Sequence, residues 1–94
     1  MKSILIAVVV TIGLASAQAA IAQEALAKSS GCLNCHAVDT KKIGPSFKSV
    51  AEKYKGKADA EATLTAKLKS GSGHPAVKAS DDDVKSLVKW VLAM

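Results

Sequence analysis

The residues with the most evident chemistry lie together in the stretch Gly31-Cys32-Leu33-Asn34-Cys35-His36. This stretch holds both cysteines of the 94-residue chain and one of its two histidines. Two thiols at a Cys-x-x-Cys spacing can form thioether bonds to the two vinyl groups of one haem, and a histidine directly after them can bind the iron. The motif therefore predicts one covalently attached haem c, with Cys32 and Cys35 as anchors and His36 as the proximal axial ligand.

Three other interpretations of these residues explain less. A thioredoxin-like redox pair requires a βαβ context, and the sequence shows no strand-like alternation. A structural zinc site needs four ligands, which the two cysteines, His36 and His74 could supply, but zinc ligands come in separated pairs whereas Cys35 and His36 are consecutive. A disulfide between Cys32 and Cys35 would close a very small loop and add little stability.

The N-terminal segment has the pattern of a cleaved secretory signal peptide. Lys2 precedes an almost unbroken apolar run, Ile4–Leu14, and small residues follow. The run is shorter than the roughly 20 apolar residues that cross a bilayer, and an Ala-x-Ala pattern favours cleavage after Ala22. We therefore expect residues 1–22 to be a signal peptide and residues 23–94 to form one domain, with an uncleaved membrane anchor as the alternative.

The expected domain is short of large apolar side chains. It holds 72 residues, 94 minus 22, with one tryptophan, one tyrosine and one phenylalanine: Trp90, Tyr54 and Phe47. A chain of this length buries a small fraction of its surface and usually needs a metal, disulfides or a cofactor to be stable. A bound haem would supply the missing core.

The hydrophobic periodicity predicts an all-α domain of three or four short helices packed around that haem. We expect loops or turns at Cys32–Lys42, with room for one helical turn at the cysteines, at Gly44-Pro45 and at Ser70–Pro75. Ser80 is a suitable N-cap for the last helix. The expected helices are Glu24–Ser30, closed by Gly31; a segment from Ser46 with Phe47, Val50, Ala51 and Tyr54 on one face, stopped by Gly56; Asp59–Lys69; and a segment from Asp81 with Val84, Leu87, Val88, Val91 and Leu92 on one face.

Two segments, GCLNCHAVDTKKIGPSF at Gly31–Phe47 and SDDDVKSLVKWVL at Ser80–Leu92, resemble the class I c-type cytochromes. The resemblance is to the short bacterial monohaem kind and covers nearly all of residues 23–94. It implies a small cytochrome c fold and a periplasmic carrier that passes single electrons between redox partners. Outside the haem motif, the sequence shows no nucleophile–base pair and no carboxylate cluster for acid–base work, so we expect no enzyme activity.

The resemblance also assigns structural roles to three residues. It implies that Gly31 allows the first and last helices to cross closely, with Trp90 near the crossing. It implies further that the backbone carbonyl of Pro45 accepts a hydrogen bond from the second ring nitrogen of His36, which would fix the tautomer of this ligand.

The sequence departs from the family at the sixth iron ligand, usually a methionine followed by proline in the loop before the last helix. Of the two methionines, Met1 lies in the expected signal peptide and Met94 is the last residue. His74, followed by Pro75, stands at about the ligand position. We predict that His74 and His36 both bind the iron and that the reduction potential is lowered, because imidazole favours ferric iron more than a thioether does.

Two alternatives for His74 stay open. His74 near the iron but unbound would leave an open or displaceable sixth position, as in a haem-based ligand-binding or sensing protein. His74 exposed to solvent would have no role at the haem. A further alternative is that the chain acts only as a subunit of a larger redox enzyme.

The charge of the expected domain suggests its partners. Residues 23–94 contain 12 lysines, no arginine and 8 acidic residues, a net charge of +4. Lysines without interleaved aromatic residues do not make a nucleic-acid surface. We expect a monomer without stable membrane insertion that docks to acidic or polar surfaces of redox proteins. Solubility alone is the other explanation of the charge; the candidate docking lysines are Lys41, Lys42, Lys48 and Lys78.

Overall fold

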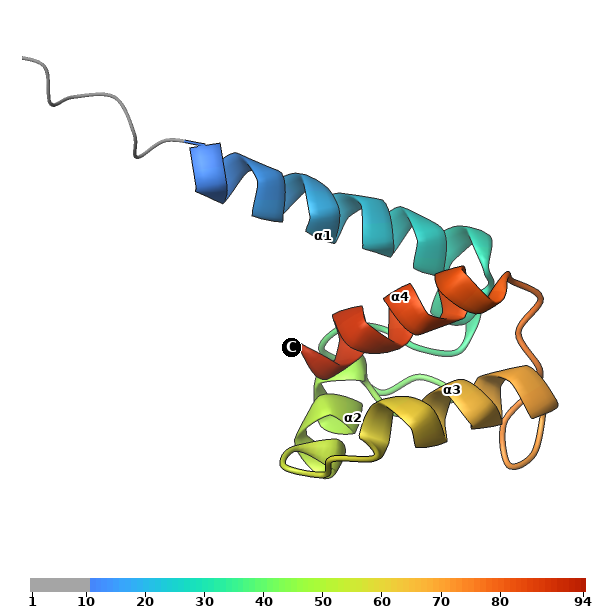
Figure 1. The fold of residues 1–94 in the computed structure, drawn as a ribbon. Coiled ribbons are helices and arrows are strands. Elements are labelled where there is room, and N and C mark those ends of the chain that lie inside the picture. The colour runs from blue at the N-terminus through green and yellow to red at the C-terminus, as the bar shows by residue number, and fades with distance from the viewer. Residues whose placement is uncertain (1–10) are drawn as a thin grey trace, which may run out of the picture.

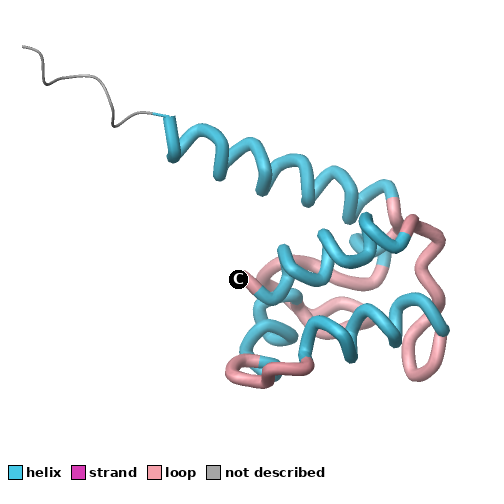
Figure 2. The backbone as a smooth tube through the Cα atoms, viewed as in Figure 1, coloured by secondary structure: helices cyan, strands magenta, loops and turns pink. Residues whose placement is uncertain are grey.

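The computed structural model describes residues 11–94, and this part of the chain folds into four α-helices and one 3₁₀ turn, with no strand (Figures 1 and 2). The predicted all-α class is confirmed. The first part of the expected signal peptide, residues 1–10, lies outside the described residues. None of the helices described is both long and apolar enough to cross a membrane. The elements in chain order are α1 Thr11–Ser29, η1 Cys32–Asn34, α2 Phe47–Tyr54, α3 Ala60–Ser70 and α4 Asp81–Leu92.

Helix α1 starts earlier than the sequence suggested. The predicted helix was Glu24–Ser30, whereas α1 begins at Thr11 and ends at Ser29. The added segment is rich in alanine, which has the highest helix propensity, and it contains no proline to interrupt the backbone hydrogen bonds. The helix therefore continues through the expected cleavage site at Ala22.

Gly31 is required for a different reason from the one that the family resemblance implied. A Cβ atom at Gly31 would meet only Asn34 Nδ2, at 3.7 Å. No other helix therefore packs closely against this position. Its φ is +85°, a left-handed conformation that glycine adopts without steric cost. The glycine is needed to turn the chain from α1 into η1. The small residue that α1 buries is Ala27, which is fully inaccessible, in a helix that contacts α4.

Helices α2 and α4 begin where the sequence predicted, each at a serine cap. Ser46 Oγ accepts a hydrogen bond from the Ser49 amide at 3.1 Å, and Ser80 Oγ accepts one from the Asp83 amide at 3.2 Å. Each bond satisfies one backbone donor that has no partner inside its helix. The caps place the starts of two helices that line the site described below.

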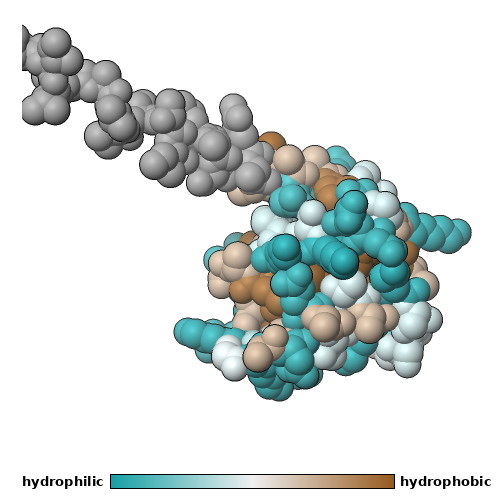
Figure 3. Space-filling view, in the orientation of Figure 1, coloured by the Kyte–Doolittle hydropathy of each residue, from teal (hydrophilic) through white to brown (hydrophobic). Residues whose placement is uncertain are grey.

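Helix α4 is the centre of the fold, since it contacts α1, α2 and α3. The buried apolar core is small and consists partly of alanines. Figure 3 shows one face of the molecule, which is mostly hydrophilic with hydrophobic residues visible between the polar ones. The prediction of a thin core is confirmed for the described residues; the buried apolar residues are Ala27, Phe47, Ala51, Ala60, Val84, Leu87 and Val88.

Replacing Ser80 by alanine should lower the free energy of unfolding by about 1 kcal/mol, because the cap of α4 loses its acceptor. The measurement is denaturant unfolding of the purified protein with its cofactor. Ser72→Ala is the matched control: Ser72 is exposed and lies outside any helix, so its effect should stay below about 0.5 kcal/mol. Equal effects of the two substitutions would show that the cap is not important for α4.

Candidate cofactor site

A cavity of about 410 Å³ lies where the helices meet. All five residues that the sequence singled out line it: Cys32, Cys35, His36, Pro45 and His74. They come from η1, the loop after it and the loop between α3 and α4. The cavity is walled mainly by apolar side chains that the helices leave partly uncovered, among them Val50, Leu64, Leu68 and Val91.

The ring of His36 is held by a hydrogen bond to the backbone of Pro45, at 2.6 Å between Nδ1 and the carbonyl oxygen. A carbonyl oxygen can only accept, so Nδ1 carries the proton and donates it. In the neutral ring the other nitrogen, Nε2, then keeps its lone pair. This is the form of histidine that binds a metal, with its orientation fixed by the bond at Nδ1.

Gly44 makes room for this ring. A Cβ atom at Gly44 would lie 2.8 Å from Nδ1 of His36 and 3.0 Å from Nε2, closer than real Cβ contacts. Any other residue would push the ring or the loop aside. Gly44 therefore lets the chain pass directly beneath the imidazole on its way to Pro45.

Two aromatic side chains hold the His36 ring in place. Phe47, the first residue of α2, stacks on His36 with ring centroids 5.3 Å apart and an interplanar angle of 24°. Trp90 of α4 meets Phe47 edge to face at 5.5 Å, an arrangement that aromatic pairs favour. The sequence had placed Phe47 on a helix face without seeing this contact, which joins His36 to the central helix.

His74 lies opposite His36 across the cavity. The two rings are nearly parallel, with an interplanar angle of 4° and centroids 6.0 Å apart. His74 Nδ1 lies 2.7 Å from the carbonyl oxygen of Pro75, so it also donates, and its Nε2 also keeps a lone pair.

The loop that carries His74 is closed by contacts at both ends. Gly71, in the left-handed conformation at φ +73°, ends α3, and the Val77 amide donates to the Leu68 carbonyl at 2.8 Å. Lys69 pairs with Asp81 at 2.6 Å, and this lysine lowers the pKa of the Asp81 carboxyl. Asp81 is exposed, so the ion pair contributes little to stability, and that contribution is lost as pH falls through the lowered pKa.

Met94, the methionine within the described residues, does not line the cavity of His36. Met94 lines a second cavity, of about 300 Å³, and is not among the residues that line the cavity of His36. The structure thus places a histidine, and no methionine sulfur of residues 11–94, opposite His36.

The two cysteines form no disulfide and both line the cavity. Burial raises the pKa of the Cys32 thiol, which keeps it protonated at neutral pH. A protonated thiol exchanges disulfides slowly, so the environment of Cys32 does not favour the redox-pair interpretation. Within residues 11–94 no cluster of three or more metal-ligating side chains is present.

The lysines at the cavity differ from those expected. Lys53 of α2 and Lys67 of α3 line it, whereas none of the four candidate docking lysines does. Lys48 pairs with Asp39 at 2.6 Å, and Lys42 Nζ donates to the Leu33 carbonyl at 3.0 Å. The sequence held one signal for Lys67, which follows Leu64 by three residues and so shares its helix face.

These features fit a haem. The cavity is apolar, two thiols at the required spacing stand at its wall, and two imidazoles with unprotonated Nε2 atoms face each other across it. A small all-α domain built around such a cavity is a c-type haem protein, in which the cofactor is attached through its vinyl groups.

Comparison with known proteins identifies the family. The sequence profile described as "Cytochrome c" matches residues 19–94, and the chain belongs to this family. It is 46% identical to cytochrome c-551 of Pseudomonas aeruginosa over 77 residues, 74% of each chain. It is 42% identical to cytochrome c-552 of Nitrosomonas europaea over 77 residues, 73% of this chain and 75% of the relative.

Solved structures agree. The crystal structure of the Class 1 cytochrome MtoD from Sideroxydans lithotrophicus ES-1 superposes with a TM-score of 0.71 at 43% identity, covering 82% of this chain and 94% of that one. The protein is thus a small monohaem c-type cytochrome, an electron carrier, and Cys32, Cys35 and His36 fit the Cys-x-x-Cys-His haem-binding motif.

Substituting alanine for Gly44 should destabilise the folded protein by about 1–3 kcal/mol, since the new methyl group overlaps the His36 ring. The displaced ring should also shift the haem absorption bands. Denaturant unfolding and visible spectra measure the two effects. Gly56→Ala is the control, because Gly56 has φ +79° and no atom within 4 Å of its Cβ position. That control should lose stability from backbone strain and keep its spectrum. A normal spectrum in Gly44→Ala would contradict the contact.

Proposed function

We propose that the protein is a periplasmic electron carrier whose single haem c is anchored by Cys32 and Cys35 and ligated by His36 and His74. One observation carries the ligand assignment: the two imidazole rings face each other in parallel, 6.0 Å apart, on the cavity of the cysteines. In both rings Nδ1 donates a hydrogen bond to a proline carbonyl, so Nε2 is the nitrogen available to a metal. The alternative of a purely solvent-exposed His74 does not explain this geometry.

The bound haem would supply a one-electron iron couple, and the chain's residues hold it in an apolar setting. Pro45, Gly44 and Phe47 restrict His36 to one orientation. The closed loop between α3 and α4 does the same for His74. Ligands held this firmly change position little when the charge on the metal changes, and this favours fast electron transfer. The apolar walls keep water away from the metal.

The second histidine has a consequence for the reduction potential. A thioether ligand raises the potential, and no methionine sulfur of residues 11–94 lies at the cavity. Imidazole is the stronger donor and stabilises ferric iron. The potential of this protein should therefore lie below that of methionine-ligated members of the family.

The proposal also gives a role to the two lysines that line the cavity. Haem carries two propionate carboxylates, and Lys53 and Lys67 are the lysines that line the cavity among the described residues. We assign these two lysines to the propionates. Their positive charge also opposes oxidation of the iron, by Coulomb's law.

The domain boundaries and location belong to the proposal as well. Residues 1–22 act as a cleaved signal peptide, and residues 23–94 form the haem domain of an exported monomer without enzyme activity. The family match at residues 19–94 covers all of the proposed haem domain and begins four residues before it. Cleavage after Ala22 would shorten α1 but keep its last turns, which hold the buried Ala27.

A haem-based ligand-binding or sensing protein is the second candidate. It is favoured by the position of His74 on a loop with two left-handed glycines, Gly71 and Gly73. In this candidate the iron would lose its sixth ligand when His74 is displaced. The experiment on His74 separates this candidate from the carrier.

His74→Ala should convert a low-spin ferric haem into a high-spin or ligand-accepting one. We expect the wild-type spectrum to lack the methionine–iron charge-transfer band and the reduced wild type to bind carbon monoxide poorly. Optical and paramagnetic resonance spectra measure these properties. Met94→Leu is the matched control and should leave every band in place. A wild type that is high-spin and binds carbon monoxide readily would favour the sensor, and spectra unchanged by His74→Ala would remove His74 from the iron.

Lys67→Gln should lower the reduction potential, because a carboxylate left without its cation stabilises ferric iron. The largest expected decrease is the Coulomb energy between the lysine charge and one unit of charge at the iron. At about 10 Å and an effective dielectric constant of about 20 this is roughly 1.7 kcal/mol, or about 70 mV, and solvent screening reduces it. Spectroelectrochemical titration measures the change. Lys78→Gln removes the same charge from a residue that does not line the cavity and should have a much smaller effect. Equal shifts would contradict the propionate assignment.

A further inference from the structure

Two lysines lie against one aromatic ring at the end of α2. Lys53 Nζ lies 5.7 Å from the centre of the Tyr54 ring and Lys57 Nζ lies 5.3 Å from it, distances at which cations interact with aromatic faces. Lys55 lies between them in sequence and is also exposed. The residues from Glu52 to Lys57 contain three lysines and one acid. None of these lysines takes part in the ion pairs found among residues 11–94, which use Lys48, Lys69 and Lys89.

Tyr54 connects this cluster to the cofactor. It lines both the haem cavity and the second cavity, and Lys53 also lines the former, while Lys55 and Lys57 line the latter. A molecule bound over the lysines would therefore lie against one wall of the haem cavity. Electron transfer weakens steeply with distance, so a docking surface at this wall is in a useful position.

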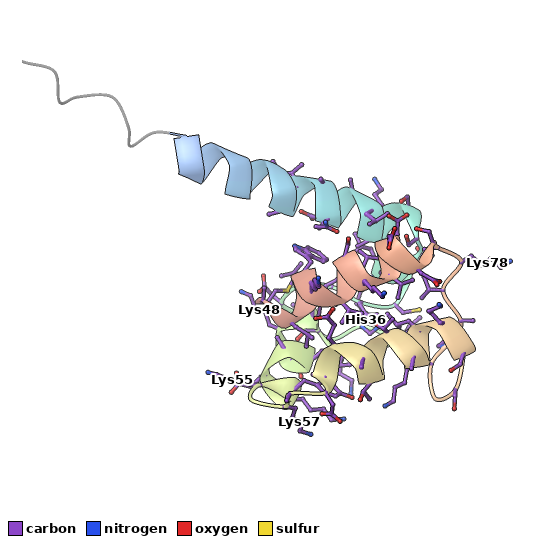
Figure 4. The ribbon with its side chains drawn as sticks, in the orientation of Figure 1. His36, Lys48, Lys55, Lys57 and Lys78 are labelled. Atoms are coloured by element: carbon purple, nitrogen blue, oxygen red, sulfur yellow. The ribbon has the colours of Figure 1, made fainter. Side chains whose placement is uncertain are left out.

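The acidic turn of α4 lies far from the lysine cluster. Asp81, Asp82 and Asp83 form its first turn, and its last residue, Leu92, lines the second cavity beside Lys55 and Lys57. The helix has 12 residues, a length of about 18 Å at 1.5 Å per residue. Figure 4 shows Lys55 and Lys57 together at one end of the domain and Lys78 at the opposite side. The acidic turn is therefore beyond ion-pair distance of Lys55 and Lys57 and does not neutralise them.

We propose that Lys55, Lys57 and Tyr54 form the docking surface for an acidic one-electron carrier protein. The unpaired positive charge fits acidic side chains, and the amphipathic tyrosine ring suits the centre of a small, short-lived contact. An anionic membrane fits less well, because lipid-binding segments usually gather 4–8 basic residues or add an apolar anchor. This inference rests on electron carriage and is independent of iron ligation by His74, so the two can fail separately.

A rival surface surrounds Ile43, whose side chain is 82% exposed next to Lys41 and Lys42. None of these three residues lines the haem cavity. Lys42 is also held by the carbonyl of Leu33. The experiment below also tests this alternative surface, because its control variant carries a substitution at Lys41.

The probe is a plant-type [2Fe–2S] ferredoxin, used as an acidic redox protein and titrated into the isotope-labelled, haem-loaded domain. At about 0.01 M ionic strength, where charges act over roughly 30 Å, NMR shifts should map to residues 52–60. Lys55→Gln with Lys57→Gln should weaken binding about fivefold or more, and the difference should vanish near 1 M salt. The control, Lys41→Gln with Lys78→Gln, removes the same charge and should change binding less than about twofold.

The outcomes are distinct. Equal loss of binding in both double variants would show that binding depends only on the net charge of the domain, and would overturn the proposal. A larger loss in the control would move the docking surface to the Ile43 side. Co-sedimentation with phosphatidylserine vesicles is the second arm: vesicle binding that depends on Lys55 and Lys57, with ferredoxin binding unaffected, would identify a membrane surface instead. The haem spectrum and reduction potential should be unchanged in the Lys55/Lys57 variant, which excludes a failure to fold or to load haem.

Discussion

The helices of this protein meet around a cavity because they have too few large apolar side chains to fill the space between them. Three of the seven buried apolar residues are alanines, and α4 contacts the other three helices without closing the gap. Such a small core would leave a domain of this length marginal by itself. The haem thus takes the place of the side chains that the core lacks, and loss of the cofactor would remove a structural element as well as the redox centre.

The same dependence explains why so much of the chain serves one imidazole ring. Pro45 orients His36 from one side, Gly44 leaves space beneath it, and Phe47 covers it and passes the contact on to Trp90. The cap at Ser46 begins α2 directly after Pro45 and so fixes the position of Phe47. A short run of sequence therefore joins the proximal ligand to the central helix, and a substitution in this run would affect stability and haem chemistry together.

Much of this could be predicted from the sequence, because the haem motif, the serine cap at Ser80 and the helix periodicity are local patterns. The family resemblance supplied the contact between His36 and Pro45. The early start of α1 was missed because the residues before Glu24 were assigned to the signal peptide, although their alanines favour a helix. The function of Gly31 depends on a backbone angle that the sequence does not show. The lysines at the cavity were missed because only apolar residues were assigned to the buried faces of α2 and α3, although Lys67 follows Leu64 by three residues.

The proposed carrier places its two adjustable properties on different parts of the chain. The reduction potential depends on the ligand presented by the loop between α3 and α4, where Gly71, the Lys69–Asp81 pair and the Pro75 carbonyl position His74. Partner choice depends on Lys55 and Lys57, which line the second cavity together with Tyr54. The loop and Tyr54 line the haem cavity from different elements. A histidine in place of methionine can therefore shift the potential without disturbing the docking surface, and the surface charges can change without disturbing the iron ligands.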